Sequence, residues 1–399
     1  MEPLKFKKSF TQQEGVPEKG IEKAIEIMKS GRLHRYNLEP NEISQASLLE
    51  EEFARWQGTR FCLACASGGY AIQLALRVCD VGPGDKVLAN AYTLAPVPGA
   101  IQNVGAVPVF IEIDDSYHID LDDLSSKAIE SGATTLLLSH MRGHIANMDK
   151  KLGICDANNI TLIEDCAHTM GAKWRGIKSG NFGKVAAFST QTYKHINSGE
   201  GGLLTTNDSN IAARAVISSG SYMLYERHGA IPDGQAFEPI KLETPNYSGR
   251  MDQIRAAIIR SQLPLLAKNI SRWNYLYNLF FERLSSINEI TIPIRNPEEA
   301  FVGSSIQFRI NYLESDKIVK FLDSCNLRGV QLKWFGDKEP KAYTSRYDSW
   351  TYIENLPVLP RTLNVLKNTI DMRIPLTFNK DDCDLIAKII SEEIANNFF

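Results

Sequence analysis

The chain has 399 residues, 43% of them apolar, which is enough for two or three globular domains with a sizeable core. Its 44 lysines and arginines face 47 aspartates and glutamates, so nothing in the charge favours a nucleic-acid partner. A polar start and the lack of an apolar run of about 18 residues argue against secretion and membrane spanning. Seven scattered cysteines suit free thiols in a reducing compartment, so we expect a cytoplasmic protein. From the charge balance and the lack of a long apolar run, we expect no nucleic-acid or membrane partner.

Short apolar runs alternate with amphipathic stretches from residue 60 onward, which is the pattern of βαβ units. The runs are nearly continuous, as in a mostly parallel sheet covered by helices on both faces. The predicted strands are Phe61–Ala66, Lys86–Ala91, Val107–Ile111, Thr135–Ser139 and Thr161–Glu164. The predicted helices between them are Ala71–Val78, Pro96–Asn103, Leu121–Glu130 and Met148–Asn158.

The second half of the chain begins with two further predicted strands, Val185–Ser189 and Gly202–Thr206. Helix formers dominate from Arg250 to Ile287, and Pro264 is expected to kink or break this segment. We therefore predict a larger domain over residues 1–264 and a smaller α+β domain over residues 265–399. The elements expected in the smaller domain are the strands Ser305–Tyr312 and Met372–Pro375 and the helices Asp316–Cys325 and Lys380–Asn396.

Ligands bind at the carboxyl ends of strands in parallel α/β sheets, so the turns that follow the strands are the places to look for a site. The turn after the first strand contains Gly68 and Gly69 and opens into a helix, whose N–H groups would bind a phosphate. Such a turn is as often only a turn. After the fifth strand come Glu164, Asp165 and His168, although acids at a strand end can also be solvated or cap a helix.

The third turn, Phe188–Gly202, places a single lysine, Lys194, among hydroxyl, aromatic and amide side chains. A lone lysine is most often a surface residue, but in an uncharged segment its pKa can be lowered or it can form a Schiff base. Together the three turns offer a helix N-terminus for a phosphate, a carboxylate for a pyridine nitrogen and a lysine for an aldehyde. This combination predicts a site for pyridoxal phosphate.

The chain resembles the DegT/StrS-type sugar aminotransferases, which are pyridoxal phosphate enzymes. The resemblance covers nearly the whole chain and is strongest over Glu164–Ala172, Ser189–Gly202 and Arg250–Ala257. It implies an α/β fold of the aspartate aminotransferase-like fold type I, with a mostly parallel central sheet and a smaller C-terminal α+β domain. It also implies a homodimer with shared active sites.

The same resemblance implies roles for three residues in the chemistry. Lys194 would form the Schiff base with the cofactor and act as the catalytic base. Asp165 would pair with the protonated pyridine nitrogen, and His168 would lie near the 3′ oxygen of the cofactor.

The remaining cofactor contacts are also implied by the resemblance, with departures from the usual pattern. Ser189 and the backbone of Gly68, Gly69 and Tyr70 would hold the phosphate, although Gly69 stands where relatives carry threonine. Leu94 replaces an aromatic residue that often stacks on the ring. Relatives reach the phosphate of the partner subunit with an asparagine, and here either Ser248 or Asn246 would serve.

The predicted reaction moves an amino group from glutamate or glutamine to a keto-sugar, nucleotide-linked by preference, or to a related cyclitol. One alternative is a sugar dehydratase of the same family, in which a histidine replaces the lysine, because His195 directly follows Lys194. Another is a regulatory protein that binds the cofactor without turnover. We expect no metal site, because no second ligand pair follows Cys62 and Cys65.

Overall fold

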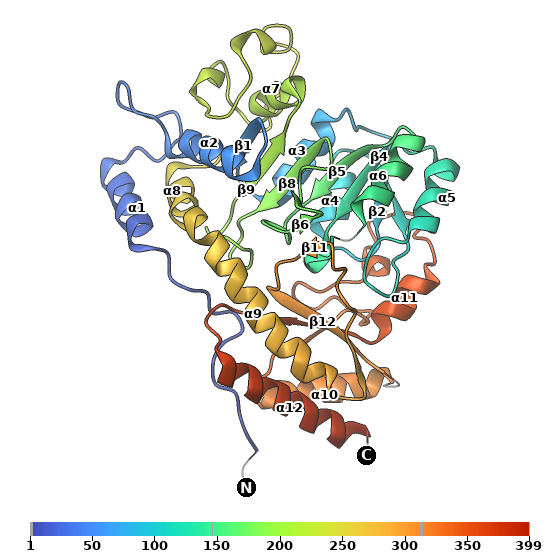
Figure 1. Cartoon of the computed structure of the whole chain (residues 1–399). Coiled ribbons are helices and arrows are strands. Elements are labelled where there is room, and N and C mark those ends of the chain that lie inside the picture. Colours follow the sequence, from blue (N-terminus) through green and yellow to red (C-terminus); the bar gives the residue numbers. More distant parts are fainter. Residues whose placement is uncertain (1–2, 146, 312–313, 399) are drawn as a thin grey trace.

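A seven-stranded sheet forms the centre of the larger domain in the computed structural model, which describes residues 3–145, 147–311 and 314–398 (Figure 1). The strand order is β1-β9-β8-β5-β4-β2-β3. Only β9 runs antiparallel to its neighbours in this sheet, which confirms the predicted mostly parallel sheet. The strands are β1 (Phe61–Cys65), β2 (Lys86–Asn90), β3 (Val107–Ile111), β4 (Thr135–Ser139), β5 (Thr161–Asp165), β8 (Val185–Ser189) and β9 (Gly202–Thr206).

Helices cover both faces of this sheet because consecutive strand residues point to opposite sides. Val87 and Ala89 of β2 face one core and Leu88 faces another. The helices on the first face are α3 (Gly68–Val78), α4 (Pro96–Asn103) and α7 (Ser209–Ser218). Those on the other face are α2 (Gln45–Gln57), α5 (Leu121–Ser131), α6 (Met148–Ala157) and α8 (Gln253–Gln262). In the described parts of the chain, we find no helix with the length and apolarity needed to cross a membrane.

The smaller domain is built on a four-stranded antiparallel sheet in the order β10-β12-β14-β13. Pro264 lies in a 3-10 turn (Leu263–Leu265) between α8 and α9, where a break was predicted. The elements are β10 (Ile290–Thr291), β12 (Ser305–Ile310), β13 (Lys333–Trp334), β14 (Thr369–Arg373), α9 (Leu266–Ser285), α10 (Ser315–Leu327) and α12 (Lys380–Phe398). Tyr312, at the end of a predicted strand, lies outside the described residues.

Several elements lie outside these two sheets or were not predicted. Helix α1 (Glu18–Ser30) packs against α8, and α11 (Pro360–Lys367) precedes β14. A small sheet has the order β11 (Glu299–Ala300), β6 (Lys173–Trp174) and β7 (Ile177–Lys178). Each of these strands has two residues, which is too short for a readable period of hydrophobicity.

The N-terminal segment crosses from the larger domain to the smaller one. Phe6 and Phe10 are buried, and their ring centroids lie 5.2 and 5.1 Å from that of Phe378. The Phe6 N–H donates to the Arg328 carbonyl. Phe6 and Phe10 therefore complete the core of the smaller domain, while the division at residue 264 stays a prediction.

Glu50 on α2 is the centre of a buried polar network that ties α2 to β1. Both its oxygens accept from Arg35, at 2.9 and 3.0 Å, and they also accept from the Ala64 and Gly229 N–H groups. Burial alone would raise the pKa of Glu50, but the charges of Arg35 and His228 outweigh it and hold the pKa far below 4.5. This stabilising contribution is present above pH 4.5 and is lost as the pH falls.

Glu50→Ala is expected to lower the free energy of unfolding by about 3–5 kcal/mol, because it leaves the Arg35 charge buried without its partner. Chemical denaturation at pH 7 measures this loss. Glu51→Ala removes the neighbouring, exposed carboxylate and should change stability by less than about 0.5 kcal/mol. Equal effects of the two variants would contradict a stabilising role for the buried pair.

Candidate active site

Asp165 lies at the carboxyl end of β5, between the ends of β4 and β8. The parallel register places it beside Ser139 of β4 and Ala187 of β8. The Ser139 hydroxyl donates to Asp165 Oδ2 at 2.9 Å, and the Ala167 N–H donates to Oδ1 at 3.1 Å. These bonds hold the buried carboxylate at the sheet edge where a ligand would bind.

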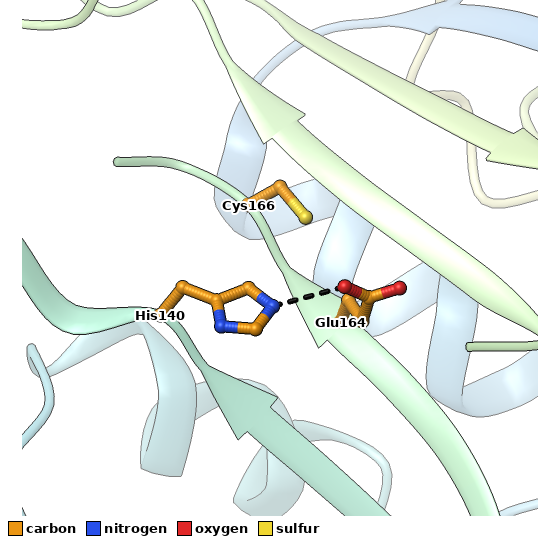
Figure 2. A group of neighbouring side chains, drawn as sticks. All are labelled: His140, Glu164 and Cys166. Carbon is orange, nitrogen blue, oxygen red and sulfur yellow. Dashed lines mark hydrogen bonds and ion pairs between the residues drawn. The ribbon is translucent and has the colours of Figure 1, made fainter. Parts of the chain in front are cut away.

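Glu164, the residue before Asp165, points to the opposite side of β5 and forms a separate cluster with His140 and Cys166 (Figure 2). Its Oε2 accepts from His140 Nε2 and the Gly180 N–H, both at 2.9 Å. Its Oε1 accepts from two further N–H groups, those of Phe182 and Gly183. Glu164 thus accepts four hydrogen bonds and fixes the segment that leads into β8. Its role is structural, whereas Asp165 lies at the sheet edge.

Lys194 lies in the loop that joins β8 to β9, whose base is closed by the pairing of Ser189 with Gly202. Its Nζ is 2.8 Å from His168 Nε2. His195 turns elsewhere, with its Nε2 3.0 Å from the Ser304 hydroxyl. The structure therefore brings Lys194 and His168 together and keeps the ring of His195 out of this contact.

The environment of Lys194 favours its neutral amine. Burial and the charge of Arg142 lower the pKa of Lys194 to about 7, against the opposing charge of Asp165. Burial and the charge of Lys194 also hold the pKa of His168 well below 6.5, so the imidazole is neutral at pH 7. Once one of the two nitrogen bases has taken up a proton, their contact at 2.8 Å lets that proton pass between them.

The reactivity of Lys194 is expected to rise as the pH increases through about 7, because only the neutral amine attacks an aldehyde. The measurement is the rate at which the cofactor-free protein takes up pyridoxal phosphate, followed by absorbance between pH 5.5 and 9. An ordinary amine with a pKa near 10.5 would give a rate that still climbs at pH 9. That profile would show that Lys194 is charged at neutral pH.

The start of α3 offers a cradle for a phosphate. Ser67 caps the helix, since its Oγ accepts from the Tyr70 N–H at 3.1 Å. The N–H groups of Gly68 and Gly69, in the first turn, have no acceptor within the helix. A Cβ on Gly68 would lie 2.6 Å from Ser189 Cβ, so glycine lets the helix start touch the end of β8. These residues fit a phosphate group, with the Tyr70 N–H already engaged by Ser67.

The other predicted cofactor contacts lie in two further segments of the chain. Leu94 packs against a cluster that contains Tyr92 and Phe335, two buried rings with centroids 5.0 Å apart. Asn246 Oδ1 accepts from the Ser248 N–H within the segment that follows α7. This segment lies beside the end of β1, because the Gly249 carbonyl accepts from the Ala66 N–H at 2.8 Å. The reach of Ser248 or Asn246 to a partner subunit stays a prediction.

Three cations near Lys194 were not predicted from the sequence. Arg142 lies in a 3-10 turn (Met141–Gly143) after β4, Lys333 lies on β13 and Arg373 ends β14. We call Arg142, Lys333 and Arg373 the cationic cluster. They are 40 to 231 residues apart along the chain. No local spacing joins them, so only the packing of the two domains could reveal the cluster.

The fold is similar to that of several solved aminotransferase structures. DesV of S. venezuelae, solved with a ketimine intermediate, superposes with a TM-score of 0.78 at 25% identity over 94% of each chain. 3-Amino-5-hydroxybenzoic acid synthase superposes with a TM-score of 0.82 at 21% identity, over 96% of this chain and 98% of that one. The chain thus has the α/β fold type I of pyridoxal phosphate aminotransferases.

A family match then identifies the chain more narrowly. The model of the DegT/DnrJ/EryC1/StrS aminotransferase family matches residues 17–390, so the chain belongs to this family and is a transaminase of the sugar aminotransferase type. A GDP-perosamine synthase of Caulobacter vibrioides is 31% identical over 70% of this chain and 73% of that protein. An L-glutamine:2-deoxy-scyllo-inosose aminotransferase of Streptomyces lividus is 32% identical over 62% of this chain and 58% of that protein.

Proposed function

We propose that this protein transfers an amino group from glutamate or glutamine to a keto-sugar, nucleotide-linked by preference, or to a related cyclitol. The observation that carries the proposal is the contact between Lys194 and His168 at the same sheet edge as Asp165. The names of two relatives, a GDP-perosamine synthase and a scyllo-inosose aminotransferase, support this range of acceptors. We further propose a homodimer, as the family resemblance implies, and a cytoplasmic location, as the scattered free cysteines favour.

The residues at the sheet edge match the parts of pyridoxal phosphate one by one. The N–H groups of Gly68 and Gly69 and the Ser189 hydroxyl would hold the phosphate. Asp165 would face the pyridine nitrogen, and the Lys194 amine would meet the aldehyde. When bound, the cofactor supplies an electron sink for the carbon that loses a proton.

The chain itself supplies the base that moves this proton. Lys194 is neutral in about half of the molecules at pH 7, because its pKa is about 7. Its Nζ can therefore accept a proton from the substrate carbon and return it elsewhere. The neutral His168 ring, 2.8 Å away, orients the amine and can relay the proton.

The two alternatives from the sequence have less support. A dehydratase needs a histidine in place of the lysine, but His195 contacts Ser304 and packs against Trp273 instead. One relative is named a pleiotropic regulatory protein, from Geobacillus stearothermophilus, at 30% identity over 56% of each chain. The presence of Lys194, Asp165 and His168 together argues against a protein that only binds the cofactor, since binding alone would not require all three.

The test uses the purified protein loaded with pyridoxal phosphate. L-glutamate or L-glutamine should convert the absorbance band of the aldehyde form to that of the amine form. Keto-sugar nucleotides, free keto-sugars and keto-cyclitols are then screened for the one that restores the first band. If the protein binds the cofactor but neither donor converts the aldehyde band within hours, the proposed transamination is wrong.

A further inference from the structure

The cationic cluster lies on the face of the smaller sheet that is turned toward Lys194. Lys333 of β13 pairs with Asp371 of β14 across the two strands, and Arg373 follows two residues later on the same face. Arg142 approaches from the larger domain, with its Nη2 2.9 Å from Asp371 Oδ2. The two domains thus bring their cations to one place.

Aromatic rings hold the cluster beside the catalytic lysine. The Arg373 guanidinium lies 3.8 Å from the ring centroid of Tyr193, the residue directly before Lys194. Tyr343 packs against Tyr193, with centroids 5.8 Å apart, and the Lys333 ammonium lies 6.0 Å from the Tyr343 ring. The charges of Arg142, Arg373 and Lys333 all act on the Lys194 amine, so the cluster borders the reacting nitrogen.

The positive charge of this cluster is not balanced by the carboxylate that faces it. Asp371 serves Arg142 and also accepts from Gln307 Nε2 at 2.8 Å. Arg142 is 7% exposed, and its buried Nε has no acceptor among the described residues. Burial lowers the pKa of Lys333 to about 8 and of Arg373 to about 10, with the charge of Arg142 acting in the same direction and that of Asp371 opposing it. An anion bound between partly buried cations stabilises their charged forms, because it offsets both their mutual repulsion and the cost of burial.

We propose that Arg142, Lys333 and Arg373 form a subsite for an oxyanion, a carboxylate above all, on the substrate that reacts at Lys194. Guanidinium groups bind carboxylates through paired hydrogen bonds, and an ammonium adds a third donor. The carboxylate belongs either to the amino-acid donor or to an acidic keto acceptor. The inference rests on the proposed function, since it names the chemistry that the same site recognises.

The test measures anion binding apart from turnover. Glutarate, a dicarboxylate without an amino group, is titrated into the protein loaded with pyridoxal phosphate and followed by calorimetry. Arg373→Met and Lys333→Met should each weaken glutarate binding about tenfold or more, and Arg373→Lys should restore part of it. Lys320→Met removes an exposed cation from the same domain and should leave the affinity unchanged. Arg142 is left intact because its loss would strand Asp371.

The source of the carboxylate follows from the half-reaction with L-glutamate. A tenfold rise in the half-saturating glutamate concentration in both methionine variants assigns the subsite to the donor. Unchanged glutamate saturation with lost glutarate binding assigns it to the acceptor. Glutarate that fails to bind the wild type, or binds all variants equally, overturns the subsite. A wild type that binds glutarate but never reacts with an amino donor counts against the proposed function instead.

Discussion

Lys194→Ala is expected to lower the rate of transamination by at least about a thousandfold, because it removes both the nucleophile for the cofactor aldehyde and the proton carrier. The absorbance band of the bound cofactor should shift to that of the free aldehyde. Fold and thermal stability should be kept, since Lys194 lies in a loop whose base is held by the pairing of Ser189 with Gly202. Stopped-flow absorbance with L-glutamate measures the loss.

Lys184→Ala is the matched control, because it removes an exposed ammonium from the residue directly before the strand that leads into the loop. It should leave the rate within about twofold of the wild type, as expected for a surface substitution. A Lys194→Ala variant that still transaminates at an ordinary rate would show that another group carries the amine chemistry. His195 is the nearest alternative by sequence, so Lys194→Ala/His195→Ala would then be compared.

Asp165→Asn is expected to lower kcat by about a hundredfold to a thousandfold, because the amide cannot supply the negative charge that a protonated pyridine nitrogen needs. The Ser139 hydroxyl can still donate to the amide oxygen, so the side chain keeps its place. Loss of this charge also removes the group that raises the pKa of Lys194. The pH profile of cofactor uptake should therefore move below 7 in the variant.

Two further variants separate charge from position at this carboxylate. Ser139→Ala deletes one hydrogen bond to Asp165 and should lower kcat by about tenfold or less. Asp156→Asn, at an exposed position on α6, should have no effect on the rate or on the pH profile. A large loss of kcat in Asp165→Asn without any change in the profile would place Asp165 too far from Lys194 to act on its charge.

The central sheet could be predicted from the sequence because its strands are buried on both faces and read as apolar runs. The division of labour between Glu164 and Asp165 could not, since both acids follow the same run. The strand places them on opposite sides, where one clamps backbone N–H groups and the other faces the ligand edge. The side chains of β5 alternate between the two faces of the sheet, and this alternation separates the two acids. The strand also ends at Asp165, one residue beyond the predicted end at Glu164.

The helix at the phosphate cradle shows a second limit of the sequence. It was predicted from Ala71, but it begins three residues earlier, after the cap at Ser67, so Gly68 and Gly69 are the first helical residues. Their N–H groups therefore point out of a helix end, as the predicted phosphate contact requires. The cationic cluster could not be predicted from local sequence patterns. Lys333 lies on β13, a strand of only two residues, and Arg142 lies after a strand of the other sheet.

The loop that carries Lys194 is expected to tolerate insertions and deletions poorly. Both ends of the loop are fixed by the antiparallel pairing of β8 with β9, so a gained or lost codon between Ser189 and Gly202 cannot be absorbed by sliding the strands. Such a change would displace the lysine while the surrounding sheet stayed paired.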